Sequence, residues 1–216
     1  RELKVHRERV FHSSQEDPSH LRKARVAGVS REWPEEKRPA KVKTQRKPLL
    51  KGPEELFTAL VLATRDFVRK NGMEKAVVGV SGGIDSALTT AIAAEALGAQ
   101  NVIAVSMPGP YTSKGTRKDA RRVAENLGAE FHELSIKNVF RSLTNAMALS
   151  FKGLEPDVTE ENMQARLRGV VLMSMANKKK AMVLAPGNKS EASAGYCTLY
   201  GDTVGGFAPL LDVYKT

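Results

Sequence analysis

Hydrophobic and polar positions along residues 50–216 change repeatedly between two spacings. Short strand-like runs occur at 76–80, 102–105, 130–134 and 182–185. Longer segments with apolar residues three or four positions apart predict helices over 53–70, 87–97, 116–127, 138–149, 160–177 and 190–196. Pro53 suits a first helical residue, and Thr159 is the expected N-cap of the helix over 160–177.

This alternation of strands and helices determines the fold class that we expect. Strands that alternate with helices of 10 residues or more form parallel sheets with helices on both faces. The sequence therefore predicts an α/β fold with a doubly wound parallel sheet. In such sheets ligands bind at the carboxyl ends of the strands, which is where we look for chemistry.

Composition excludes several other classes. A chain of 216 residues with 41% hydrophobic content can bury one main core with an appendage. No stretch approaches the roughly 20 apolar residues of a membrane span, so we expect no membrane partner. The single cysteine, Cys197, excludes an intramolecular disulfide and suits a reducing compartment, so we expect a cytoplasmic protein. We interpret Cys197 as a half-buried structural thiol in preference to a nucleophile.

The net charge of +10 is concentrated in the first part of the chain. Residues 1–50 contain 14 Lys and Arg against 7 Asp and Glu, and prolines interrupt them without apolar periodicity. This composition is typical of a solvated linker, and aromatic residues that stack on bases are sparse there. We therefore expect no nucleic-acid partner.

The segment Gly79-Val80-Ser81-Gly82-Gly83-Ile84-Asp85-Ser86 joins the strand that begins at 76 to the helix over 87–97. Glycines let a backbone approach an anion, and the free N–H groups and dipole of a helix N-terminus favour phosphate. Asp85 supplies a carboxylate for Mg²⁺ and Ser86 a hydroxyl donor. The alternative is an ordinary turn in which Asp85 and Ser86 only cap the helix. No Lys follows the glycines, so this is not a Walker A loop.

Further polar residues are candidates for the same site. Asn162 and Arg166 are four residues apart on one predicted helix and share a face that suits an anionic or amide-bearing substrate. Glu191 follows the strand over 182–185 and is a second candidate Mg²⁺ ligand, although it also suits the first turn of a helix. Lys215 would offset charge on a leaving phosphate group if it lay near the loop.

The motifs SGGIDS, MPGPYTS, ENMQARLR, GNKSE and YGD, with a final Lys-Thr, occur in this order. The SGGxDS string resembles the pyrophosphate loop of the ATP pyrophosphatase family, and the ordered set resembles the synthetase domain of glutamine-dependent NAD⁺ synthetases. The resemblance covers residues 51–216 and implies an adenine nucleotide alpha hydrolase-like fold. It implies ATP-dependent amidation of deamido-NAD through an adenylate, with ATP and Mg²⁺ as cofactors. Alternatives are a GMP-synthetase-like amidating enzyme, a tRNA thiolase, or a non-catalytic nucleotide-binding fragment.

The resemblance also implies residue roles. Ser81, Asp85 and Lys215 would be catalytic, Asp85 and Glu191 would bind metal, and Asn162, Arg166 and Glu191 would contact deamido-NAD. ATP would be held by the following residues: Gly79, Val80, Ser81, Gly82, Gly83, Ile84, Asp85, Ser86, Pro186 and Lys215. Pro186 departs from the family, which commonly has Thr there, and Gly109 stands where Ser is common.

The resemblance finally implies the context of the chain. Residues 1–50 would be a basic linker and the remnant of an upstream nitrilase-like glutaminase domain that supplies ammonia. The synthetase domain would continue beyond Thr216, so that residues 51–216 alone are expected to be an incomplete enzyme. We also expect a homo-oligomer.

Overall fold

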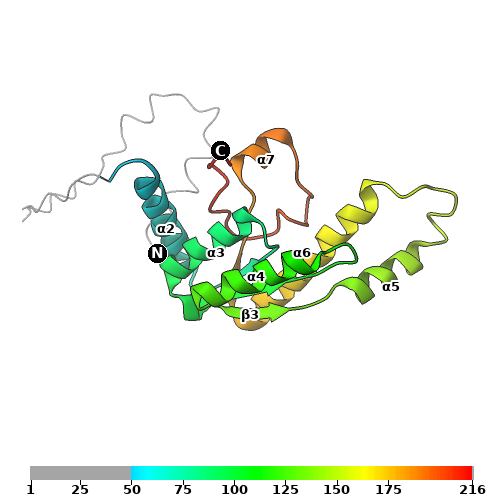
Figure 1. The fold of residues 1–216 in the computed structure, drawn as a ribbon, viewed down its shortest axis with the longest axis horizontal. Helices are drawn as coiled ribbons and strands as arrows, with labels where there is room; N and C mark the ends of the chain where they lie inside the picture. The colour runs from blue at the N-terminus through cyan, green and yellow to red at the C-terminus, as the bar shows by residue number, and fades with distance from the viewer. Residues whose placement is uncertain (1–49, 216) are drawn as a thin grey trace, which may run out of the picture. The chain divides into compact units, whose positions relative to one another are not determined.

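The computed structural model describes residues 50–215, and the linker and glutaminase remnant expected in residues 1–50 therefore lie almost wholly outside the described residues. The helices and strands of the described part follow the predicted alternation (Figure 1). In chain order they are α2 (Gly52–Lys70), β1 (Lys75–Gly79), α3 (Ile84–Leu97), η2 (Ala99–Asn101), β2 (Val102–Ser106), α4 (Lys114–Leu127), β3 (Glu130–Glu133), α5 (Lys137–Met147), α6 (Val158–Lys179), β4 (Ala181–Leu184) and α7 (Lys189–Ala194).

Within residues 50–215 the four strands form one parallel sheet in the order β3-β2-β1-β4. Val77 of β1 is aligned with Ile103 of β2 on one side and with Val183 of β4 on the other. The chain thus adds β2 and β3 on one side of β1 and then returns to add β4 on the other. The predicted doubly wound fold is confirmed, and its switch point lies between β1 and β4.

Successive residues of β1 point to opposite faces of the sheet and enter two different layers of core. Ala76 and Val78 pack in a cluster with residues of α2 and α3, whereas Val77 packs with residues of α6. All three side chains are fully buried. Because both faces are covered by helices, the central strand is apolar at every position from 76 to 78, as the sequence pattern predicted.

The start of α6 differs from the predicted one. Asp157, and not Thr159, is the N-cap of α6: its side chain accepts a hydrogen bond from the Thr159 N–H at 2.7 Å. Glu160 completes a reciprocal capping box by accepting from the Asp157 N–H at 2.9 Å. Asp and Thr are both good N-caps, so residue type alone did not decide between two positions that are two residues apart.

None of the helices between residues 50 and 215 has the length and apolar character that a membrane span requires.

Candidate active site

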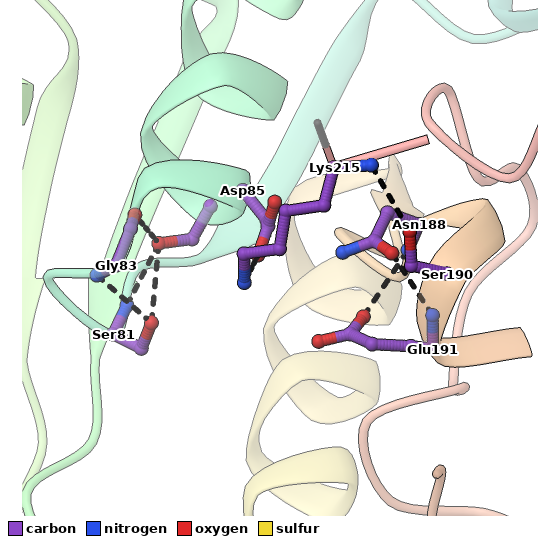
Figure 2. A network of polar contacts seen from close by, with 8 residues as sticks. Ser81, Gly83, Asp85, Asn188, Ser190, Glu191 and Lys215 are labelled. Atoms are coloured by element: carbon purple, nitrogen blue, oxygen red, sulfur yellow. Dashed lines mark hydrogen bonds and ion pairs between the residues drawn. The ribbon is translucent and has the colours of Figure 1, made fainter. Parts of the chain in front are cut away.

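The segment between β1 and α3 is held in shape by its own two serines. The Ser86 hydroxyl donates to the Gly83 carbonyl at 2.9 Å and accepts from the Ser81 N–H at 3.2 Å. The Ser81 hydroxyl in turn accepts from the Gly83 N–H at 3.2 Å (Figure 2). The N-cap of α3 is Gly83, which has no side chain to cap the helix, so Asp85 and Ser86 do not serve as N-caps. The structure therefore contradicts the ordinary capped turn and leaves the N-terminal amides of α3 without a side-chain cap.

Gly82 is the position in this segment that requires glycine. Its φ of +85° lies in the region that L side chains rarely adopt, and a Cβ there would lie 2.5 Å from the carbonyl oxygen of Thr116. The glycine lets the segment lie directly against the first turn of α4.

One cavity, of about 580 Å³, opens at the carboxyl ends of β1 and β2. Its walls come from the segment after β1, from the connection between β2 and α4, from α6 and from the loop after α7. The residues that line it include Gly79, Val80, Ser81, Met107, Tyr111, Arg117, Glu161, Arg168, Leu172, Pro186 and Asp202. The cavity is thus mainly apolar, with charged side chains from α4, from α6 and from the loop after α7.

The two arginines of this cavity were missed in the sequence analysis. Arg117 of α4 forms an ion pair with Glu133 at the end of β3, and its Nε donates to Glu133 at 3.1 Å. This bond holds the pKa of the Glu133 carboxyl below its ordinary value. Arg168 of α6 donates from Nε to the Met107 carbonyl at 3.2 Å, and burial lowers the pKa of its guanidinium. No ion pair of Arg168 occurs within residues 50–215, so a cationic group faces the cavity without a carboxylate from this part of the chain.

The sequence did carry a signal for both arginines. Arg117 lies on the predicted helix over 116–127, which contains four Lys and Arg residues, and Arg168 lies in the QARLR string two residues after Arg166. The spacing of that string, however, favoured the pair at 162 and 166, which turns a different face to the rest of the protein.

A second cavity, of about 330 Å³, lies on the other side of the same segment. Ser81, Pro186 and Asp202 line both cavities, so the segment and the end of β4 separate them. The second cavity is also lined by Gly83, Asp85, Ser86, Asn188, Glu191 and Cys197. It lies at the carboxyl ends of the strands, where the sequence predicted ligands, and at the switch point between β1 and β4 that the strand order defines.

Of three predicted residues that are far apart in the sequence, Asp85 and Glu191 line this second cavity and Lys215 contacts Asp85 (Figure 2). The Lys215 Nζ donates to Asp85 Oδ2 at 2.9 Å, and the Lys215 backbone N–H donates to the Ser190 hydroxyl at 3.1 Å. The hydrogen bond and the charge of Asp85 raise the pKa of Lys215, and the charge of Glu191 raises it further. The Lys215 side chain therefore spans the space from α7 to α3 and brings a positive charge to two carboxylates.

A divalent metal, which the resemblance implies, suits this donor set. The second cavity is lined by the carboxylates of Asp85, Glu191 and Asp202, and within residues 50–215 no three His, Cys, Asp or Glu side chains gather at metal-binding distance. Mg²⁺ commonly binds one or two carboxylates and completes its shell with phosphate oxygens and water. The Lys215 ammonium beside Asp85 shows that the place already attracts a cation.

Asn162 and Arg166 share a face of α6 as predicted, but their contacts in the structure are with the chain itself. Asn162 Oδ1 accepts from the Thr198 hydroxyl at 2.8 Å, and Arg166 Nε donates to the Leu199 carbonyl at 3.2 Å. Neither residue lines either of the two cavities. What the pair visibly does is fix the loop that carries Asp202.

Other predicted positions differ in how they meet the cavities. Gly82 and Ile84 line neither cavity, and Ile84 is 67% exposed.

Cys197 is exposed and lines the second cavity, so the prediction of a half-buried structural thiol is wrong. A Cβ on Gly109 would lie 2.5 Å from Gln164 Oε1, so a larger residue there requires the end of the Gln164 side chain to move.

A family model described as NAD synthase matches residues 56–216. The chain belongs to this family. A glutamine-dependent NAD(+) synthetase of Thermotoga maritima is 54% identical over 169 residues, which make up 78% of this chain and 29% of that protein. A protein of the same description from Rhodobacter capsulatus is 51% identical over 163 residues, 76% of this chain and 30% of that protein. The chain thus spans less than a third of the length of these curated relatives.

Solved structures show the same relationship. The glutamine-dependent NAD⁺ synthetase of Acinetobacter baumannii, solved in complex with ADP, superposes with a TM-score of 0.77 at 48% identity, over 80% of this chain and 33% of that one. An NMN synthetase of Francisella tularensis superposes with a TM-score of 0.70 at 30% identity, over 76% of this chain and 66% of that one. The ATP pyrophosphatase fold of NAD synthetases is therefore the fold of this chain.

Proposed function

We propose that the chain is the synthetase part of an enzyme that amidates deamido-NAD to NAD⁺ at the expense of ATP. The observation that carries the proposal is the serine-pinned segment Ser81–Ser86, which separates two cavities at the switch point of the sheet. One cavity suits a nucleoside and the other has carboxylates and an ammonium for phosphates and metal. The identity of 54% to a glutamine-dependent NAD(+) synthetase favours this reaction among those of the fold.

In this proposal the adenosine part of ATP occupies the larger cavity. Met107, Tyr111 and Leu172 offer apolar surface there, and Arg117 and Arg168 offer positive charge. The triphosphate would pass along the segment after β1, where glycines and free helical amides favour an anion. The residues proposed to hold ATP remain Gly79, Val80, Ser81, Gly82, Gly83, Ile84, Asp85, Ser86, Pro186 and Lys215, with Gly82 and Ile84 acting only through the backbone.

Asp85, Glu191 and Lys215 are proposed to manage the charge of the phosphates. Asp85 and Glu191 would hold Mg²⁺, and Lys215 would then turn its ammonium from Asp85 toward the leaving pyrophosphate. A bound Mg²⁺ supplies neutralisation of the phosphate charges. Ser81, whose hydroxyl lies between the cavities, would orient the α-phosphate.

The reaction needs little acid–base chemistry from the protein. A carboxylate oxygen of the nicotinate attacks the α-phosphorus, and the bond to the bridging oxygen breaks with its electron pair leaving on pyrophosphate. Ammonia then attacks the acyl carbon, AMP leaves, and the nitrogen loses a proton to become the amide of NAD⁺. The contribution of the residues is to position the carboxylate and to stabilise developing charge.

The remaining parts of the proposal concern the longer protein. Residues 1–50 are proposed to connect to a glutaminase domain that delivers ammonia, and the protein is proposed to be a homo-oligomer. Asn162 and Arg166 would take part in binding deamido-NAD by holding the loop in place at Thr198 and Leu199. Glu191 would contact deamido-NAD directly.

A mononucleotide substrate is the second candidate, because an NMN synthetase shares the fold over 76% of this chain. The experiment that separates the two measures pyrophosphate release from Mg·ATP and ammonium in the presence of deamido-NAD or nicotinic acid mononucleotide. We expect release with deamido-NAD and formation of NAD⁺. Pyrophosphate release with the mononucleotide alone would overturn deamido-NAD as the substrate. If the full-length protein releases no pyrophosphate with either compound, the proposed function is wrong.

A further inference from the structure

Asn188 is a buried polar residue that uses only part of its hydrogen-bonding capacity. It is 2% exposed, and its Nδ2 has no hydrogen-bond partner among residues 50–215. Buried amide groups are nearly always paired, so an orphaned one calls for a partner outside the described protein.

The orientation of the Asn188 side chain is fixed by its role at the start of α7. Its Oδ1 accepts from the Glu191 N–H at 3.0 Å, and its backbone N–H donates to Glu191 Oε2 at 3.2 Å. Because the oxygen is committed to the cap, the NH₂ group must point the other way. Asn188 lines the second cavity, and in Figure 2 its amide nitrogen points toward the side on which Asp85 and the Lys215 ammonium lie.

Helix capping alone does not require an amide. Ser and Asp cap helices about as well as Asn, and neither would leave a buried NH₂ group without a partner. The amide therefore carries a cost that the cap does not explain, and it lies in the cavity beside the carboxylates of Asp85 and Glu191.

We propose that Asn188 recognises the ligand of the second cavity, its Nδ2 donating a hydrogen bond to a phosphate or carboxylate oxygen. This inference rests on the proposed function and adds a specificity residue to it. The same residue also positions Glu191: its side-chain oxygen accepts from the Glu191 N–H, and its backbone N–H donates to the Glu191 carboxylate. A phosphate oxygen would come from the pyrophosphate part of ATP, and a carboxylate oxygen from the nicotinate of deamido-NAD.

The test compares variants that keep the cap and lose the amide. Asn188→Ser and Asn188→Asp both retain an oxygen that can accept from Glu191, and both remove Nδ2. Asp157→Ala is the matched control, because it removes the cap of α6 at a position that lines neither cavity. Calorimetric titrations of the 216-residue chain with Mg²⁺ present would use pyrophosphate in one series and deamido-NAD in another, and thermal unfolding would be recorded for each variant.

We expect both Asn188 variants to bind one of the two probes about tenfold more weakly or worse, with thermal unfolding close to that of the wild type. Weaker binding of pyrophosphate would identify a phosphate oxygen as the partner of Nδ2, and weaker binding of deamido-NAD would identify an oxygen of deamido-NAD. Asp157→Ala should unfold at a lower temperature and bind both probes as the wild type does.

Three results would overturn the inference. If Asn188→Ser binds both probes like the wild type, the amide makes no ligand contact. If probe binding is weakened in Asn188→Asp but not in Asn188→Ser, the introduced negative charge, and not the loss of the amide, causes the weaker binding. If the wild-type chain and the full-length protein bind neither probe, the proposed function fails, and the inference fails with it.

Discussion

Replacing Gly82 with Ala tests the close contact on which the shape of the segment proposed to bind phosphate depends. The new Cβ would lie 2.5 Å from the Thr116 carbonyl oxygen, whereas ordinary contacts begin at 3.4 Å, so backbone must move by about 0.9 Å. The φ of +85° adds a conformational cost of about 1–2 kcal/mol for a residue with a Cβ. Backbone displacement of this kind costs about 1–3 kcal/mol more, so the free energy of unfolding should fall by about 2–5 kcal/mol.

Gly83→Ala is the matched control in the adjacent position. Gly83 has an ordinary φ of −88°, and a Cβ there would meet only the Ser81 Oγ at 3.3 Å. Its loss of stability should be about 1 kcal/mol or less. Urea unfolding measures both variants, and calorimetry measures ATP binding, which should weaken about tenfold in Gly82→Ala because the displaced amides no longer converge on the phosphates. Equal stability and equal ATP affinity in the two variants would refute this reasoning.

Three further predictions concern charge and the unusual proline. The Lys215→Met variant should bind Mn²⁺ more tightly in the absence of nucleotide, because Asp85 loses its ammonium partner, and electron paramagnetic resonance measures this affinity. The rate of pyrophosphate release by the same variant should fall about 100-fold. Arg117 lowers the pKa of Glu133, so their pair stabilises the fold above the ordinary pKa of 4.5 and is lost as pH falls through the lowered value. Glu133→Gln should therefore flatten the acid limb of a stability–pH profile measured by thermal unfolding. Pro186→Thr should tighten ATP binding several-fold in calorimetry, since a hydroxyl donor is added at a position that lines both cavities.

Each of these has a result that contradicts it. Unchanged Mn²⁺ affinity in Lys215→Met would show that the ammonium does not compete for Asp85. An acid limb that is the same in Glu133→Gln would assign acid unfolding to other carboxylates. Weaker ATP binding in Pro186→Thr would mean that the ring of Pro186, and not a missing hydroxyl, matters to the ligand.

The sequence predicted the sheet and the location of the site because both follow from local patterns. The apolar residues at 76–78 and the glycines after them identify a buried strand and a phosphate-type turn without any knowledge of distant contacts. The alternation of elements predicted a site at the carboxyl ends of the strands, and the strand order of the structure then places the switch point between β1 and β4.

What could not be predicted depends on segments far apart in the chain. The prediction that Asn162 and Arg166 share one face of a helix was correct. Only the folded chain shows that Thr198 and Leu199 contact these two side chains. Similarly, the spacing of Asn188 and Glu191 in the GNKSE string is that of a capping box, but the burial that leaves the Asn188 amide without a partner within residues 50–215 appears only in the folded chain.

The most direct test of the account measures pyrophosphate released from Mg·ATP by the full-length protein, with ammonium and deamido-NAD supplied and NAD⁺ quantified. The account predicts pyrophosphate and NAD⁺ in equal amounts, and loss of both in Asp85→Ala with the fold intact. Pyrophosphate release that does not depend on deamido-NAD, or wild-type turnover in Asp85→Ala, would contradict it.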